Sequence, residues 1–315
     1  MLVVVLSSQL LYYLLIAQTG VVGAFNSHLP DLYTLPIGGV IGSLFAAYWR
    51  HIEIKQELFF MFGTQIIISW FYPDYSLGIL LAFGFMIGYT TPLMLYGFRE
   101  QSRQNLALGL ALSYAVGTAL YTYPFEERGI IAIVLPSISL IALYFSTLPS
   151  KSTKQTAPLN WKMIGVMMVW IFTDSALFET LSRSGEMDIW GKYTAVIIVS
   201  HLFGVYLAFR YGKTLMRSTG SIIGLFALSY GVYYLQQPII LAITYPIVIS
   251  YYNVLLFREL TQMGNIRSIG IAMVGVGWGA SSMANLVALT HQLWIAIAVL
   301  GIFTLIYPFY FRRNV

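Results

Sequence analysis

A single acidic residue, Asp174, is the strongest candidate for chemistry in this sequence. It lies within the segment 161–181, WKMIGVMMVWIFTDSALFETL, and is the one Asp or Glu that sits deep inside an apolar run. A carboxylate in the hydrocarbon core of a bilayer costs about 2.5–3.5 kcal/mol on insertion scales, so such a group typically faces a polar cavity and serves a function. Asp174 can hold a proton or a cationic group of a ligand. The alternative is a structural carboxylate that accepts hydrogen bonds from Ser or Tyr hydroxyls of a neighbouring helix.

Two further ionisable side chains lie in or beside apolar segments. Glu179 follows Asp174 by five residues, which places it about 140° further round a straight helix, so the two do not form a simple carboxylate pair. We expect Glu179 at the outer interface, with a place in the cavity as the alternative. His201, in the segment 193–211, is either a proton relay or one half of a hydrogen bond between helices.

Neutral polar and aromatic side chains offer a second kind of contact. Amides in membrane bundles mostly join helices, at about 0.6 kcal/mol per bond, although each can also bind a ligand. Tyrosines deep in their segments, together with Trp170, can form an aromatic wall for an amphipathic or cationic ligand, or they can simply pack. The candidates are the amides Gln9, Gln18, Gln65, Asn253 and Asn285 and the tyrosines Tyr89, Tyr114 and Tyr230.

Signatures of enzymes and metal sites are weak. The chain has no cysteine, and its methionines favour flexible packing over a copper site, so we predict no metal and no cofactor. The residues 212–214, Gly-Lys-Thr, resemble the end of a P-loop, but Leu207 stands where the phosphate cradle requires glycine. Ser281 and His291 share one predicted helix and its end, ten residues apart, which disfavours a catalytic dyad.

The elements that position these residues are predicted to be membrane helices. Hydrophobic residues make up 58% of the 315 residues and charged residues 9%, against about 25% charged in ordinary soluble domains. A spanning helix needs about 20 apolar residues, and twelve such segments are found. They are 2–25, 33–50, 57–72, 76–98, 105–123, 129–147, 161–181, 193–211, 219–235, 239–257, 268–289 and 291–311. The first is interpreted as a membrane helix and not as a signal peptide, because no Lys or Arg precedes it.

The basic residues test this layout. With the N-terminus inside, fourteen of the seventeen Lys and Arg residues fall in inner loops, and the outer loops hold only Arg128, Arg183 and Lys192. This asymmetry predicts a protein of the cytoplasmic membrane with both termini in the cytoplasm. Because the net charge of +5 is spread over short loops, it indicates orientation in the membrane and not a nucleic-acid partner.

The two halves of the chain look like a repeat of six helices. We predict an N-terminal six-helix bundle at 1–148, a cytoplasmic linker at 149–160 and a C-terminal six-helix bundle at 161–315. Halves of this kind typically form two bundles with a binding site between them at mid-depth.

At this point the chain resembles the major facilitator superfamily. The likeness rests on the twelve-helix plan, on Gly20 to Gly23 followed by His28-Leu29-Pro30, on Gly42 and Arg50 before the third helix, and on the glycine-rich eleventh helix entered through Arg267. The motif between helices 2 and 3 is incomplete: Ala46 stands where the family has Asp, and Trp49 where it has Gly. The arginine of proton-coupled drug antiporters is missing from helix 4, so no subfamily is assigned.

The resemblance implies an all-α membrane transporter that moves a small solute by alternating access, with no cofactor. Helix 1 usually lines the cavity in that family, so Gln18 is the amide we favour for ligand binding, beside Asp174. Inner-loop residues Arg50, Arg99 and Arg103 are expected to form a cytoplasmic gate. We expect a monomer in the bilayer that binds a neutral, cationic or amphipathic solute, with H⁺ as a candidate coupling ion. A gradient-independent facilitator, an intramembrane enzyme and a channel are the alternatives.

Overall fold

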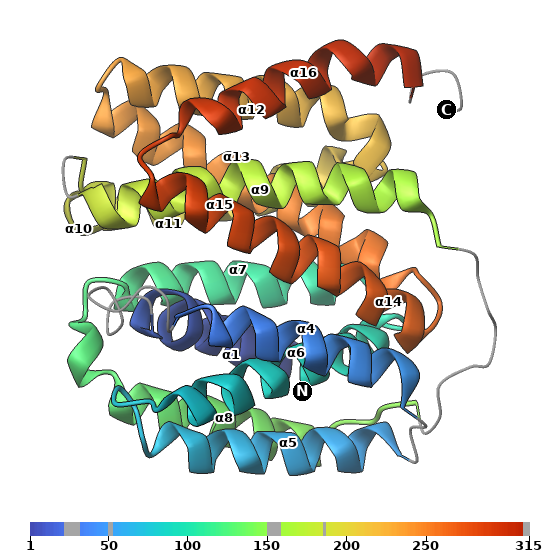
Figure 1. The fold of residues 1–315 in the computed structure, drawn as a ribbon. Helices are drawn as coiled ribbons and strands as arrows, with labels where there is room; N and C mark the ends of the chain where they lie inside the picture. Colours follow the sequence, from blue (N-terminus) through green and yellow to red (C-terminus); the bar gives the residue numbers. More distant parts are fainter. Residues whose placement is uncertain (22–31, 50–52, 150–158, 185–186, 311–315) are drawn as a thin grey trace. The chain divides into compact units, whose positions relative to one another are not determined.

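The chain is built from helices in two compact units. The computed structural model describes residues 1–21, 32–49, 53–149, 159–184 and 187–310, and Figure 1 shows their helices. Unit 1 comprises residues 1–159 and 260–274, and unit 2 comprises residues 160–259 and 275–315. The segment 260–274 therefore groups with the first half. The proposed division at 1–148, 149–160 and 161–315 stays a prediction.

Unit 1 holds the first six long helices and the beginning of the eleventh. Its elements are α1 (Leu2–Tyr12), η1 (Tyr13–Val21), α4 (Thr34–Tyr48), α5 (Ile54–Ser69), α6 (Leu77–Phe98), α7 (Arg103–Leu120), η2 (Phe125–Glu127), α8 (Gly129–Tyr144) and α14 (Ile266–Met273). Within this unit α4 packs along α6, α5 lies beside α8, and α1 packs on α7 and α8.

Unit 2 holds the remaining long helices. Its elements are α9 (Trp161–Ser184), α10 (Ile189–Lys192), α11 (Thr194–Tyr211), α12 (Leu215–Tyr234), α13 (Pro238–Thr261), η3 (Val274–Gly279), α15 (Ala280–Leu289) and α16 (Trp294–Tyr310). In this unit α9 packs against α12, α15 and α16.

The predicted twelve-helix plan is confirmed. Among the described residues, six helical segments are long and apolar enough to cross a membrane, and three shorter helices are also apolar. The two helix divisions that the apolar pattern marks least clearly lie at Gln236 and His291. Both residues have a left-handed backbone with φ of 54°, the conformation in which helices commonly end. The bend at each residue separates α12 from α13 and α15 from α16.

Glycines explain the close packing of α4 on α6. A Cβ atom at Gly38 or Gly42 would clash with a backbone carbonyl oxygen of α6, and a Cβ atom at Gly84 or Gly88 would clash with one of α4. Small residues at this four-residue spacing let two membrane helices approach until their backbones touch. The pair therefore forms a tightly joined core for unit 1.

Two helices contain π-helical turns, which the hydropathy pattern did not predict. Residues Tyr13–Val21 continue α1 as η1, and Val274–Gly279 join α14 to α15 as η3. Wide turns of this kind are rare and often occur at functional sites. The motif residues Gly23, His28 to Pro30 and His51 lie outside the described residues.

Candidate functional site

Asp174 lies midway along α9 and is held by two tyrosines of α13. The Tyr252 hydroxyl donates a hydrogen bond of 2.5 Å to Oδ2 of Asp174, and the Tyr245 hydroxyl lies 2.8 Å from Oδ1. The Tyr245 hydroxyl is also 2.9 Å from the Asp174 carbonyl oxygen, so its hydrogen is shared between two acceptors. Both tyrosines are 0% exposed.

The spacing of these tyrosines follows from helix geometry. Residues seven apart differ by about 20° around an α-helix, so Tyr245 and Tyr252 share one face of α13, two turns apart. A third tyrosine reaches the same turn of α9, because the Tyr230 hydroxyl of α12 donates to the Thr173 carbonyl oxygen at 2.7 Å. We call Tyr230, Tyr245 and Tyr252 the tyrosine cluster.

The tyrosine cluster makes Asp174 a defined acceptor in an apolar surrounding. Phenol hydroxyls stabilise a carboxylate by hydrogen bonding without neutralising it. Among the described residues no Lys, Arg or His forms an ion pair with Asp174. The residue remains half-buried, and Pro246, next to Tyr245, interrupts the backbone hydrogen bonding of α13. The arrangement can accept a proton or a cationic group, and α13 contains a point at which it can bend.

His201 of α11 contacts a different face of α13. Its Nδ1 lies 2.6 Å from the Ser250 hydroxyl, and the side chain is buried. Ser250 is five residues from Tyr245, which places it about 140° away from the tyrosines that hold Asp174. The structure therefore does not bring His201 together with Asp174. The observed contact is a hydrogen bond between helices, which was the alternative interpretation of His201 to a proton relay.

Glu179 forms a buried ion pair near the end of α9. Its Oε2 lies 3.3 Å from Nε of Arg183, one turn further along, and Arg183 Nη2 donates to Asn285 Oδ1 of α15 at 2.7 Å. Glu179 is only 6% exposed, and the ion pair explains its burial, because a carboxylate can be buried when a guanidinium accompanies it. Its place at the outer interface stays a prediction.

Gln18 lies in η1, the π-helical part of helix 1, and is half-buried. The adjacent Thr19 hydroxyl lies 2.8 Å from Nη1 of Arg128. Arg128 was assigned to an outer loop, but it is 4% exposed and reaches into helix 1. Burial lowers the pKa of its guanidinium, and the electrostatic influence of Tyr72, Tyr121 and Glu126 opposes that shift.

The remaining predicted contacts are spread over both units. The Tyr89 hydroxyl of α6 donates to Glu57 Oε2 of α5 at 2.5 Å, and its ring stacks on Phe85. Tyr114 on α7 and Asn253 on α13 are both half-buried. A cluster of three or more His, Asp and Glu side chains able to hold a metal ion is not found in the part of the chain that the structure describes.

Two of the three residues predicted to form a gate, Arg99 and Arg103, lie at the end of α6 and the start of α7. Arg99 pairs with Glu100 at 3.1 Å and donates to the Gly264 carbonyl oxygen at 3.4 Å. Arg103 is exposed, and Arg50 lies outside the described residues. The gate function stays a prediction.

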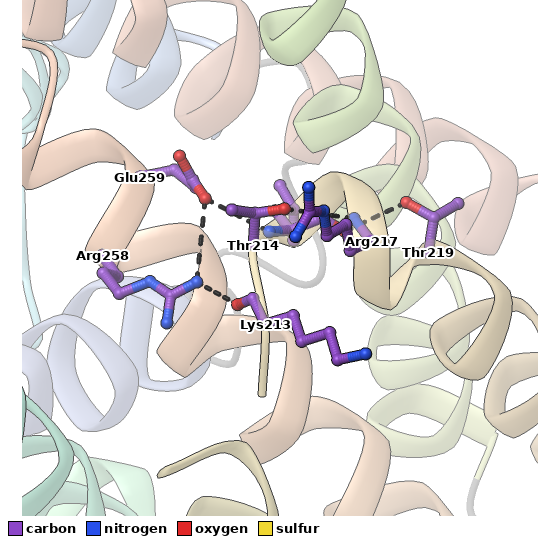
Figure 2. Close-up of polar contacts among 7 residues, drawn as sticks. Lys213, Thr214, Arg217, Thr219, Arg258 and Glu259 are labelled. Atoms are coloured by element: carbon purple, nitrogen blue, oxygen red, sulfur yellow. Dashed lines mark hydrogen bonds and ion pairs between the residues drawn. The ribbon is translucent and has the colours of Figure 1, made fainter. Parts of the chain in front are cut away.

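A second set of polar contacts, similar to that of Arg99 and Glu100, lies at the end of α13 (Figure 2). Arg258 donates to the Lys213 carbonyl oxygen and lies 3.9 Å from Glu259, and Glu259 Oε1 accepts a hydrogen bond from the Leu215 backbone N–H at 3.2 Å. Thr214 caps α12 with its side chain. These contacts fix the loop between α11 and α12 to the end of α13.

The residues that sequence reasoning missed carried recognisable signals. Tyr245 and Tyr252 have the seven-residue spacing of a helix face, and the triplet Phe-Arg-Glu occurs at both 98–100 and 257–259. Arg128 had no such signal, because the position of a residue in a loop does not predict which helix its long side chain contacts.

Comparison with known proteins gives the fold. No protein-family model matches the sequence, and no curated protein matches it. Solved structures do. The human organic anion transporter MFSD10 superposes with a TM-score of 0.70 at 12% identity over 97% of both chains. The proton:xylose symporter XylE gives 0.67 at 14% identity, over 99% of this chain and 94% of that one. FucP in an outward conformation gives 0.68 at 9% identity, over 97% and 98%. These likenesses confirm the predicted fold.

Proposed function

We propose that this chain, which has the fold of the major facilitator superfamily, is a secondary transporter that moves a small solute across the cytoplasmic membrane by alternating access. Transport in such folds comes from rocking of helical bundles about a site at mid-membrane depth. Similarity of fold supports transport only by analogy, since one fold hosts several functions. The proposal therefore depends on the chemistry of a site in the chain itself.

The observation that carries the proposal is the carboxylate of Asp174, midway along an apolar helix and bound only by tyrosine hydroxyls among the described residues. A group of this kind is costly in a membrane and is typically retained for a function. It can take up a proton from one side and release it to the other, or bind a cationic part of the solute. One of the similar structures is a proton:xylose symporter, which agrees with coupling to protons.

The solute that fits these groups is neutral, cationic or amphipathic. In unit 2 the half-buried carboxylate of Asp174 suits a cationic group, whereas the rings of the tyrosine cluster are buried and their hydroxyls are bonded to α9. Both termini are proposed to lie in the cytoplasm, because the basic residues gather in the loops on that side.

Transport in sealed vesicles tests this function. Wild type and Asp174→Asn are reconstituted, and a panel of small organic solutes is offered with and without an imposed pH gradient. We expect wild type to accumulate one solute only with the pH gradient, and Asp174→Asn to exchange that solute without accumulating it. Accumulation by Asp174→Asn equal to that of wild type would contradict coupling through this residue.

A gradient-independent facilitator is the second candidate. The tyrosine cluster favours it if the carboxylate serves only to join α9 to α13. In that case wild type equilibrates the solute with or without the pH gradient, and Asp174→Asn changes the amount of folded protein but not the direction of transport.

A further inference from the structure

Helix 1 changes from α-helical to π-helical form ahead of its binding candidate, Gln18. Residues Leu2–Tyr12 are α-helical, and the nine residues Tyr13–Val21 are π-helical. A π-helix is rare and mostly limited to a single turn, so a stretch of this length needs support from outside the helix. Gln18 lies within it, next to Thr19.

That support is found at Arg128, at the start of α8. Its Nη1 donates to the Leu15 carbonyl oxygen at 2.8 Å and to the Thr19 hydroxyl at 2.8 Å. Its Nε donates to the Tyr123 carbonyl oxygen at 2.9 Å, and Nη2 donates to that of Tyr121 at 2.7 Å. One guanidinium thus joins the π-helical segment to the loop between α7 and α8.

The chemistry of these contacts is unusual for a buried cation. Among the described residues no carboxylate lies within ion-pair distance of Arg128. Oxygen atoms of the backbone and of one hydroxyl bind its guanidinium directly, and Glu126 acts on its charge from further away. A guanidinium has five N–H donors in a fixed plane and suits several carbonyl groups at once. A wide helical turn offers such carbonyls, because its own hydrogen bonds are displaced.

A second contact fits helix 1 to the same loop. The Tyr72 hydroxyl donates to the Phe125 carbonyl oxygen at 2.6 Å, and a Cβ atom at position 20 would clash with that hydroxyl. Glycine at this position leaves room for the Tyr72 hydroxyl, which connects helix 1 with the loop between α7 and α8. The Thr19 hydroxyl also donates within the segment, to the Leu14 carbonyl oxygen at 2.8 Å.

We infer that Arg128 is a positioning residue, which keeps the segment Tyr13–Val21 π-helical and thereby sets the direction in which Gln18 points. A π turn holds one more residue than an α turn. Relaxation to an α-helix would therefore turn the side chains beyond the transition by about 100°, the angle of one residue. Gln18 would then leave the face of helix 1 that it now occupies.

The consequence for solute binding rests on the proposed function, but the conformational claim does not. The chain contains no cysteine, so a single introduced cysteine is the only thiol. We would place one cysteine at a time at positions 13 to 21 and measure the rate of labelling by a water-soluble methanethiosulfonate reagent. Each series is made in wild type, Arg128→Gln, Arg128→Lys and Thr19→Val, omitting position 19 from the last. The matched control is Glu127→Gln, an exposed change in the same loop.

The expected result is a labelling pattern that moves by one position beyond the transition in Arg128→Gln, as a change from π to α turns requires. Thr19→Val, which removes one acceptor and keeps the shape of the side chain, shifts the pattern in the same direction to a smaller extent. Arg128→Lys rescues it in part, and Glu127→Gln leaves it unchanged. If Arg128→Gln does not fold, the two milder variants decide. An unchanged pattern in every folded variant would overturn the inference.

Transport then separates this inference from the proposed function. If a transported solute is found, Arg128→Gln should raise its KM and leave the maximal rate of the folded protein nearly unchanged. The effect of Arg128→Gln on KM should be non-additive with that of Gln18→Ala, because both variants remove the contact between Gln18 and the solute. A shifted labelling pattern without any transport would support the role of Arg128 and count against the proposed function alone.

Discussion

Replacing Tyr252 by Phe tests whether Asp174 is a charged acceptor. The substitution removes the hydroxyl that donates to Oδ2 and keeps the ring, which lies 5.6 Å from the ring of Phe226. A hydrogen bond to a charged group contributes about 1.5–3 kcal/mol to stability, whereas a neutral bond between membrane helices averages about 0.6 kcal/mol. If Asp174 is ionised, Tyr252→Phe lowers the free energy of unfolding by the larger amount.

A double-mutant cycle with Asp174→Asn measures the part that depends on charge. In the Asp174→Asn background the bond is neutral, so Tyr252→Phe should cost only about 0.6 kcal/mol there. The free energy of unfolding is measured by SDS titration in mixed micelles. Tyr206→Phe, at an α11 position that is 52% exposed, is the matched control and should change nothing. An equal cost of Tyr252→Phe in both backgrounds at neutral pH would refute the reasoning.

Three further changes have expected outcomes that the same titration or hydrogen exchange can check. Gly42→Ala drives a methyl group into the backbone of α6 and should cost about 1–3 kcal/mol, while Gly63→Ala, which meets open space, should gain up to about 1 kcal/mol. Arg183→Gln removes the cation from the buried Glu179 and should lower the free energy of unfolding by up to about 3–5 kcal/mol. If the second change Glu179→Gln restores this stability, the pairing is supported. Glu259→Ala removes an acceptor from the first turn of α12 and should cost about 0.5–2 kcal/mol, with faster amide exchange in that turn; unchanged exchange would contradict the contact.

Helix positions were predictable because membrane insertion is decided locally. Apolar runs of the right length mark the spans, and the basic residues of the loops indicate on which side of the membrane each span begins. Even the narrow divisions at Gln236 and His291 were found, because polar residues interrupt the apolar runs there. Asp174 stood out for the same reason, since one ionised group in an apolar run is visible without any structure.

Contacts between helices were not predictable to the same degree. Whether Asp174 meets Tyr245 or another hydroxyl depends on the rotation and offset of two helices, and neither is encoded in the residues of one of them. The burial of Arg128 depends on a loop folding back on helix 1. The π-helical form of Tyr13–Val21 leaves no mark in hydropathy, because nearly every residue of the segment is compatible with either turn.

Coupled transport through Asp174 requires that this residue faces a path open to water from both sides of the membrane. Asp174→Cys provides the only thiol in the chain, and a membrane-impermeant thiol reagent can be applied to right-side-out and inside-out vesicles in turn. We predict that the reagent labels this cysteine from each side, because an alternating-access site opens to both. Labelling from neither side, in a folded protein, would place residue 174 against lipid or in a closed core and would contradict the proposed function.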